Sequence, residues 1–425
     1  MKILSVISHI SYIVLFFLMT FNPFYNYEFK AIPLAIVLCT FLWFILSKES
    51  KFDYSHLVLT LYYSAIGLFF VLLGIYKNTA IKDSYYYTTP LYVIYPLLFF
   101  VITAPIVQLR QIKIAEYTIY FSTVCVSIYL ALYIGSKVGI TPFEVPEIEE
   151  SQNATLIDGV PRFKISSIST LIFAVPFIMT KAILDIDRPK LMLYVCLILG
   201  FLGVILSGRR MLLLLMVCSP FFVFIFSLLA IKRQTVYRKF TLFLVPLFAI
   251  LTLIVVYSSQ YIEIDLTNVT QKLTDALDTS DNSVDDANLE RMPQVSSLVN
   301  GWLDSPLLGN GYGSSSDHIR NADKPWQYEI GYLAQLFRTG TIGFLLYILG
   351  PLYTFWGLFK ISKSTDRYWS HTAIAMAVGL VSTYIAYSSN PYIEALDILW
   401  TIFLPVTFIN VYKKEQHALL ATENI

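Results

Sequence analysis

Charged residues are scarce in this chain of 425 residues: Asp, Glu, Lys and Arg together make up 14% of it, whereas hydrophobic residue types make up 56%. A water-soluble globule of this length needs many more polar side chains to cover its surface. The mean hydropathy of +0.63 points the same way. The composition therefore excludes a soluble globular protein and predicts an integral membrane protein.

Cysteine is also rare, and each of the four cysteines falls in a different apolar run. They are Cys39, Cys125, Cys196 and Cys218. This distribution excludes a disulfide framework, so we expect reduced cysteines that serve in packing. A calcium-binding loop is missing as well, because the acidic stretch DNSVDDANLERM at 281–292 lacks the central glycine that such a loop needs. We predict no metal and no other cofactor.

Long apolar runs are what the sequence has in abundance. A helix needs roughly 20 apolar residues to cross the hydrocarbon core of a bilayer, and twelve runs of about this length can be distinguished. They cover residues 4–24, 30–47, 56–76, 87–107, 117–136, 165–184, 191–207, 211–231, 240–259, 330–359, 370–388 and 394–412. We therefore predict an all-α polytopic membrane protein with about twelve transmembrane helices, which form a single transmembrane domain over residues 1–425.

Lys and Arg collect in alternate loops between these runs, and this pattern sets the expected orientation. If the N-terminus lies in the cytoplasm, the inner segments hold seventeen of the thirty Lys and Arg residues. The outer segments are much longer in total but hold only twelve, and Arg338 lies inside a run. We therefore expect a multi-pass protein with both termini in the cytoplasm.

Two outer loops follow from this orientation, at 137–164 and 260–329. The second is the only long polar stretch of the chain, and a loop of that length is commonly functional. Apolar residues recur in it at near-helical spacing over NLERMPQVSSLVNGWLDSP, which predicts an amphipathic helix. Because proline is tolerated in the first turn of a helix, Pro293 places Arg291 at or just before the helix start. A glycine-rich turn, PLLGNGYG, follows.

Several motifs occur in an order that is informative. They are PRFK at 161–164, SGRR at 207–210, Arg291, Trp302, PLLGNGYG at 306–313 and EIGYLAQLFRTGTIG at 329–343. Together with the many apolar runs, this order resembles the bacterial O-antigen polymerase and O-antigen ligase superfamily. The resemblance covers roughly residues 160–350.

The resemblance implies a metal-independent glycosyltransferase in the bacterial inner (cytoplasmic) membrane. Such a polysaccharide polymerase transfers a glycan from undecaprenyl pyrophosphate to the sugar of another lipid-linked repeat unit at the outer face. Its partners would be the undecaprenyl pyrophosphate-linked oligosaccharide, the lipid bilayer and a chain-length regulator protein, with no nucleic acid. The alternatives are an O-antigen ligase, which passes the polymer to lipid A core, and a transporter or flippase, although we find no internal repeat of the kind typical of transporters.

One position departs from the pattern of the ligases. In that pattern a histidine ends the long loop within the motif H-N-x-x-L, and a glycine lies eleven residues after this histidine. Here Glu329 occupies the place of the histidine, while Leu333 and Gly340 are in register. The departure weakens the ligase interpretation.

Arginines are the candidate ligands of the pyrophosphate, because their planar, permanently charged fork suits phosphate oxygens. The candidates are Arg209, Arg210, Arg162, Arg338 and the catalytic Arg291. For the pair in SGRR, the alternative is that both side chains extend to the membrane interface as helix-end anchors. Arg338 is costly inside an apolar run and should face a cavity or a carboxylate.

Glu329 and His318 compete for the role of catalytic base. Glu329 lies where the long loop meets the next apolar run, and partial desolvation there would raise the pKa of its carboxyl group. The alternative is a carboxylate that is merely favoured by a helix dipole. His318 is a candidate because histidine is the most common general base, although a lone loop histidine is usually only solvated. Among the aromatic residues, Trp302 and Tyr312 are candidates for stacking on sugars.

Overall fold

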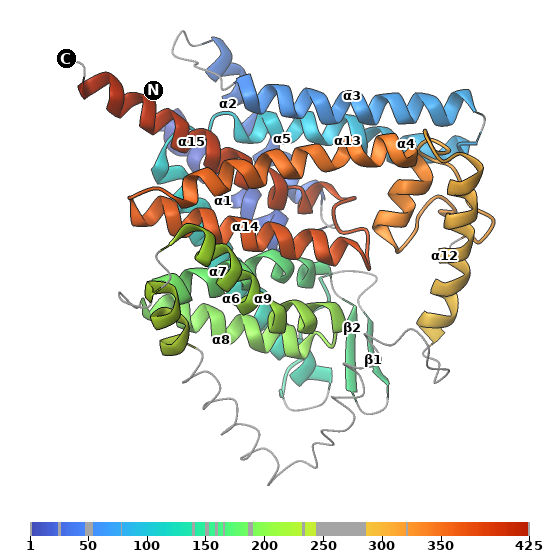
Figure 1. The fold of residues 1–425 in the computed structure, drawn as a ribbon. Coiled ribbons are helices and arrows are strands. Elements are labelled where there is room, and N and C mark those ends of the chain that lie inside the picture. Colours follow the sequence, from blue (N-terminus) through green and yellow to red (C-terminus); the bar gives the residue numbers. More distant parts are fainter. Residues whose placement is uncertain are drawn as a thin grey trace. The chain divides into compact units, whose positions relative to one another are not determined.

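The protein is almost entirely helical in its computed structural model (Figure 1). The structure describes residues 2–23, 27–46, 54–77, 79–137, 141–148, 153–157, 160–164, 166–185, 190–231, 234–243, 286–319 and 322–423. The chain divides into two compact units. The first contains Met1–Ser122, Asp285–Leu358 and Thr383–Ile425, and the second contains Thr123–Val284 and Phe359–Ser382. Each unit is described by itself.

The first unit contains the N-terminal helices, the helix of the long loop and the C-terminal helix. Its elements are α1 (Lys2–Phe21), α2 (Tyr27–Leu46), α3 (Tyr54–Tyr76), η1 (Lys82–Ser84), α4 (Tyr85–Thr89), η2 (Pro90–Ile94), α5 (Tyr95–Thr103), the start of α6 (Leu109–Lys137), α12 (Asp286–Asp304), most of α13 (Gly331–Ser362), the end of α14 (Arg367–Tyr387), η4 (Leu396–Ile398) and α15 (Trp400–Glu423). Within it, α1 packs against α2, and α5 packs against α2, α3 and α15.

Prolines explain why the stretch from Lys82 to Thr103 is divided into short helical pieces. Pro90 opens the π-helical turn η2, and Pro96 lies in the first turn of α5. Proline has no N–H to donate and crowds the preceding turn, so the regular hydrogen-bond ladder cannot run through it. The chain nevertheless keeps a helical course through this stretch, because the residue that follows each of the four pieces also has right-handed helical backbone angles.

The second unit is built around α7 (Leu171–Leu184), whose residues are all buried. The other elements are the end of α6, β1 (Asn153–Ile157), β2 (Val160–Lys164), η3 (Ser166–Thr170), α8 (Leu191–Leu206), α9 (Arg210–Ala230), a helix over 234–243 and the start of α14. α7 packs against both α8 and α9. Close packing depends on small residues, since a Cβ on Gly379 would lie 2.9 Å from the ring of Phe173 in α7.

Helices occupy all of the apolar ranges predicted from the sequence except 240–259, most of which lies outside the described residues. Six of them are long and apolar enough to cross a membrane: His56–Tyr76, Lys82–Thr103, Leu109–Lys137, Ser166–Leu184, Arg210–Ala230 and Gly331–Ser362. The described part of the chain is thus that of a helical membrane protein. The twelve crossings, the single transmembrane domain and the orientation of the termini stay predictions.

One detail of the predicted fold was wrong, and one element was not predicted. The first outer loop contains an antiparallel hairpin of β1 and β2, in which Arg162 lies opposite Thr155. The start of the amphipathic helix was misplaced, because α12 begins at Asp286 and Pro293 is inside the helix and not in its first turn. A helix can continue through an interior proline when the rest of its length is held by packing, at the expense of one backbone hydrogen bond. The acidic segment that precedes α12 lies outside the described residues.

Candidate functional site

Two of the predicted catalytic residues form an ion pair where the predicted long loop meets α13. Arg291 lies on α12, and Glu329 lies two residues before α13. The Nε atom of Arg291 donates to Oε2 of Glu329 at 3.0 Å. Both side chains are partly exposed, at 38% and 23%. The pair is therefore within reach of a substrate.

The same face of α12 also positions the backbone around Glu329 and His318. The side-chain oxygen of Gln294 accepts the N–H of Glu329 at 3.1 Å, and the hydroxyl oxygen of Ser297 accepts the N–H of His318 at 3.0 Å. Residues 291, 294 and 297 are spaced by three, so they share one side of a helix. One helical face thus carries Arg291 and contacts the two segments that carry Glu329 and His318.

A small apolar cluster fixes α12 to the start of α13. Leu298 is fully buried and packs with Tyr328, Ala334 and Phe337. Opposite, a Cβ on Gly301 would lie 2.5 Å from the ring of Phe337. Because Leu298 is adjacent to Ser297 and close to Gln294, the cluster holds the polar face of α12 in register with the loop.

His318 has an imidazole nitrogen, Nε2, that is buried and makes no hydrogen bond to the described residues. Buried nitrogens of this kind are normally satisfied by protein or water. The backbone N–H of His318 is held by Ser297, and its carbonyl accepts from the Ser316 hydroxyl at 3.3 Å. The ring is therefore on an anchored segment and has hydrogen-bonding capacity that these contacts do not use.

The glycine-rich turn is attached to a break in α13. Gly340 interrupts α13 with a φ of 62°, and Gly309 has a φ of 66°. This break exposes carbonyl groups of the preceding helical turn. The N–H of Asn310 donates to the carbonyl of Phe337 at 2.9 Å, and the N–H of Gly311 donates to the carbonyl of Arg338 at 2.7 Å. In this structure the glycines let the loop approach the backbone of α13, which gives the loop its rigidity.

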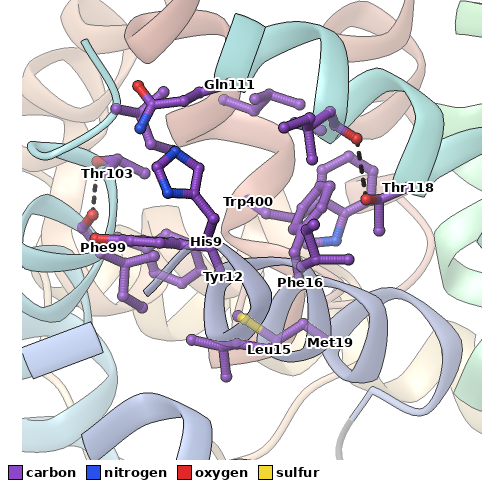
Figure 2. Close-up of a pocket in the computed structure, with 16 residues that line it drawn as sticks. His9, Tyr12, Leu15, Phe16, Met19, Phe99, Thr103, Gln111, Thr118 and Trp400 are labelled. Carbon is purple, nitrogen blue, oxygen red and sulfur yellow. Dashed lines mark hydrogen bonds between the residues drawn. The ribbon is translucent and has the colours of Figure 1, made fainter. Parts of the chain in front are cut away.

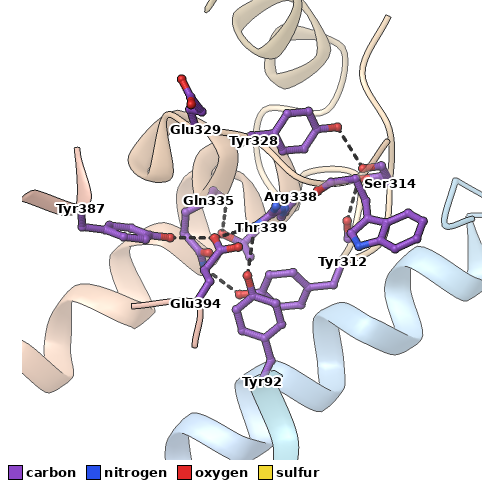
Figure 3. A network of polar contacts seen from close by, with 12 residues as sticks. Tyr92, Tyr312, Ser314, Tyr328, Glu329, Gln335, Arg338, Thr339, Tyr387 and Glu394 are labelled. Carbon is purple, nitrogen blue, oxygen red and sulfur yellow. Dashed lines mark hydrogen bonds and ion pairs between the residues drawn. The ribbon is translucent and has the colours of Figure 1, made fainter. Parts of the chain in front are cut away.

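Arg338 is the centre of a buried polar network (Figure 3). Its Nη1 donates to Oε1 of Glu394 at 2.7 Å and to the Tyr92 hydroxyl at 2.9 Å, and its Nη2 donates to the Trp326 carbonyl at 2.8 Å. Its side chain is only 4% exposed. As predicted, this cation in an apolar helix faces a carboxylate. Because its guanidinium is engaged within the protein, its predicted role as a pyrophosphate ligand gains no support from these contacts.

The network around Arg338 is distinct from the Arg291 pair. The Tyr387 hydroxyl donates to Oε1 of Glu394 at 3.0 Å, so this carboxylate has two donors. Figure 3 shows the carboxylate of Glu329 pointing away from the network. The two groups thus differ in character: one is buried and internally satisfied, whereas the other is accessible.

The two predicted sugar-stacking residues differ in the same way. Tyr312 is fully buried, and its ring stacks on Tyr92 with 3.6 Å between centroids. Its hydroxyl accepts from the Gln335 amide at 2.8 Å, and burial raises the pKa of that hydroxyl well above its usual value. Tyr312 therefore packs inside the protein, which corrects the prediction that it stacks on a sugar. Trp302 is partly exposed and donates its indole N–H to the Pro306 carbonyl at 3.2 Å, so it stays a candidate.

The SGRR motif forms the turn between α8 and α9. Gly208 has a φ of 61°, and the Arg209 N–H donates to the Ser207 hydroxyl oxygen at 3.3 Å. Arg210 is the first residue of α9, and both arginines are partly buried. Cations are disfavoured at a helix N-terminus, whereas anions are favoured there. The SGRR turn thus places two cationic side chains at a helix N-terminus.

The structure does not bring all the predicted residues into one described group. Arg209, Arg210 and the backbone of Arg162 belong to the second unit, and nothing can be said of the Arg162 side chain. The other candidates belong to the first unit: Arg291, Glu329, His318, Arg338, Trp302 and Tyr312. A shared pyrophosphate site that spans the two sets stays a prediction.

Sequence reasoning missed Gln294, Ser297 and Glu394. Gln294 and Ser297 could have been noticed as polar residues on the face of α12 that carries Arg291. Glu394 gave no such signal, because its partner Arg338 is 56 residues away in the sequence. Among the described residues, no three His, Cys, Asp or Glu side chains come together in a way that could hold a metal ion.

No protein-family model matches the sequence, and no curated protein matches it significantly. The assignment of function therefore rests on the site and on the motif resemblance.

Proposed function

We propose that this protein is a membrane glycosyltransferase that polymerises lipid-linked repeat units of a polysaccharide at the outer face of the bacterial inner membrane, with both termini in the cytoplasm. The observation that supports it most directly is the Arg291–Glu329 ion pair of 3.0 Å. It joins a cation suited to a pyrophosphate with a carboxylate suited to a sugar hydroxyl, and both are partly exposed.

The reaction requires one bond to form and one to break. The acceptor hydroxyl oxygen attacks C1 of the donor sugar, its proton passes to the carboxylate of Glu329, and the bond from C1 to the pyrophosphate oxygen breaks. Undecaprenyl pyrophosphate leaves with the electron pair. Arg291 stabilises the charge that develops on that oxygen, because a fixed guanidinium can act without a metal. In the free protein its partner is Glu329, so an arriving pyrophosphate competes for the same guanidinium.

Arg209 and Arg210 contribute a second cationic element in this proposal. They would bind the pyrophosphate of a lipid-linked substrate at the SGRR turn. The support is local: Arg209 directly precedes α9 and Arg210 begins it, where the helix N-terminus itself favours an anion. Trp302 would stack on a sugar of the growing chain.

The test uses the purified full-length protein in lipid vesicles and lipid-linked repeat units prepared from a strain that lacks the gene. A polymerase makes a ladder of glycan lengths on a gel. Glu329→Gln should reduce the rate by about 10²- to 10⁴-fold, the usual contribution of a general base. Arg291→Lys should also impair it, since Lys keeps the charge but loses the planar fork. Asp304→Asn, which removes an exposed carboxylate at the end of the same helix, serves as the matched control. A normal ladder from both Glu329→Gln and Arg291→Ala would refute the proposal.

The ligase alternative is separated by the acceptor. A ligase makes product only when lipid A core is supplied, and its deletion leaves bare core together with lipid-linked polymer. Deletion of a polymerase instead leaves single repeat units on core. The support for a ligase is the same loop and motif order, and the presence of Glu329 in place of a histidine counts against it.

A transporter is supported by a different observation. Lys30 in α2 and Asp397 in η4 form a 2.7 Å ion pair with side chains 5% and 0% exposed. Buried ion pairs between apolar helices often mark ion or substrate pathways. A transporter would move lipid-linked repeat units between the leaflets of vesicles and would make no glycosidic bond, so the ladder assay also separates this alternative.

A further inference from the structure

The first unit contains an apolar cavity that the proposed reaction does not use (Figure 2). It lies between α1, α5, α6 and α15 and has a volume of about 80 Å³. Its walls are mainly apolar, with Phe16 and Met19 from α1, Phe99 from α5 and Leu404 from α15. This volume is several times the ~10–15 Å³ that one water molecule needs, and apolar cavities tend to stay dry. Hydrocarbon is therefore the ligand that suits it.

Among the residues that line this cavity, six have a polar side-chain group: His9, Tyr12, Thr103, Gln111, Thr118 and Trp400. Gln111 lies in its wall, but its side-chain oxygen accepts the N–H groups of Val107 and Gln108 at 2.8 and 3.0 Å, so it caps the start of α6. Figure 2 shows His9 between Tyr12 and Gln111. The cavity has no carboxylate or lysine in its lining. It can accept an uncharged chain without loss of any charge–charge contact.

A second pocket adjoins the first and is more polar and basic. The two pockets share Thr103 and Ile106, and the second has a volume of about 290 Å³. Its lining includes Lys413, Lys414 and His417 from α15 but no carboxylate. His56, only 3% exposed, also lines it, and its Nε2 lies 3.3 Å from the Thr103 hydroxyl in the shared wall.

We propose that these adjoining pockets bind one anionic phospholipid, with an acyl chain in the apolar cavity and the phosphate in the lysine-lined pocket. The two parts are complementary in charge and polarity to the two parts of such a lipid. Basic pockets between membrane helices are a recurrent form of anionic lipid site. Free phosphate would leave the apolar cavity unused, and a neutral lipid would gain nothing from Lys413 and Lys414. This proposal is independent of the glycosyltransferase activity.

The first experiment measures lipid binding to the delipidated full-length protein by native mass spectrometry. Phosphatidylglycerol should bind more tightly than phosphatidylcholine with the same acyl chains, and glycerol phosphate should not compete at equal concentration. The Lys413→Gln/Lys414→Gln double variant should bind phosphatidylglycerol about 25-fold more weakly, since each lysine near an anionic lipid contributes a factor of about five. Equal binding of the two lipids, or full competition by glycerol phosphate, would overturn the proposal.

The matched control removes two lysines elsewhere. Lys360 in the last turn of α13 and Lys363 just after that helix are exposed, and neither lines the two pockets. The Lys360→Gln/Lys363→Gln variant should keep wild-type affinity for phosphatidylglycerol. An equal loss in both double variants would mean that the lipid responds to overall surface charge, which would contradict a specific site.

The second experiment locates the acyl chain. Ala115 lines the apolar cavity, so Ala115→Phe should fill it and weaken phosphatidylglycerol binding while the lysines stay in place. A measurement that does not depend on this variant uses phosphatidylglycerol with brominated acyl chains, which quench nearby tryptophans. Trp400 lines the cavity, so the quenched fraction of fluorescence should fall in Trp400→Phe. Unchanged quenching in Trp400→Phe would refute the location of the chain.

Discussion

Gly309 of the long loop packs directly against the backbone of Gly340, at the break in α13. A Cβ on either residue would overlap main-chain atoms of the other segment, and both have a positive φ, of 66° and 62°. Main-chain hydrogen bonds flank this contact, since the N–H groups of Thr341 and Ile342 donate to the carbonyls of Pro306 and Leu307 at 2.9 and 3.0 Å. The loop that carries His318 therefore starts from a rigid junction.

Gly309→Ala should loosen this junction. The left-handed conformation alone costs a non-glycine residue roughly 1–2 kcal/mol, and the overlap with Gly340 adds to that. We expect a lower midpoint of thermal unfolding in detergent and a slower glycan ladder. Gly135→Ala is the matched control, because its Cβ would meet only the side chain of Thr141, at 3.0 Å. An equal change in both variants would contradict a special role for the Gly309–Gly340 contact.

The Arg338–Glu394 pair should contribute to stability much more than the Arg291–Glu329 pair. Glu394→Gln leaves the buried charge of Arg338 without its counter-ion, and breaking a buried pair in this way typically costs about 3–5 kcal/mol. Glu329→Gln affects a partly exposed pair, for which the usual value is about 0–1 kcal/mol. The measurement is the unfolding free energy of the two variants in the same detergent. Equal losses would show that burial does not distinguish the pairs.

A double substitution also tests how much the unpaired buried charge of Arg338 costs. Arg338→Leu/Glu394→Leu removes both charges, so it should be less damaging than Glu394→Gln alone. It still loses the hydrogen bonds of Arg338 to Tyr92 and Trp326, so some destabilisation is expected.

Apolar runs of about twenty residues predicted the positions of most helices, because a helix in a membrane environment must bury its backbone polar groups within itself. The hairpin of β1 and β2 was missed because its strands are only five residues long. A signal for it was present, since the dipeptide Asp158–Gly159 between short runs is typical of a hairpin turn. The start of α12 was misplaced because proline was given more weight than packing.

The candidate site was predictable only in its local parts. Periodicity predicted α12 and the motif order selected Arg291 and Glu329, whose contact was then found across 38 residues of sequence. Neither periodicity nor composition carries information about which distant side chains meet. For that reason Glu394 was not identified as the partner of Arg338, and Tyr312 was assigned to a sugar although it is buried against Tyr92.

Asp185 should make the unfolding free energy of the second unit depend on pH in the acidic range. It follows α7, and its Oδ1 accepts from Nδ1 of His371 at 2.6 Å. Burial acts to raise the pKa of Asp185, but the hydrogen bond from His371 and the charge of Lys181 outweigh it, so the pKa is lowered. A lowered folded-state pKa contributes stability that is present above the unfolded value of about 3.9 and is lost as the pH falls through the folded value.

The measurement is unfolding free energy against pH, in the range below about pH 4 where this loss occurs. Wild type should lose stability there more steeply than Asp185→Asn, which cannot bind the additional proton on unfolding. Asp304→Asn, at an exposed position, should keep the wild-type slope. If Asp185→Asn and wild type have the same slope, the His371 contact does not govern the acid response.

The two candidate bases can be separated because α12 holds each of them in a different way. Glu329 pairs with Arg291 through its side chain, whereas His318 is held through its backbone and has a buried Nε2 that the described residues do not satisfy.

Glu329→Gln keeps the size of the side chain and can still accept from Arg291, but it cannot take a proton. If Glu329 is the base, this variant should lose about 10²- to 10⁴-fold in kcat, while KM and unfolding free energy change little. His318→Gln, which retains one hydrogen-bonding group but no proton transfer, should then keep most of the turnover. The opposite pair of results would transfer the role to His318. If both variants make polymer at the wild-type rate, neither residue is the base, and Asp317 and Glu290 become the carboxylates of the long loop to replace next.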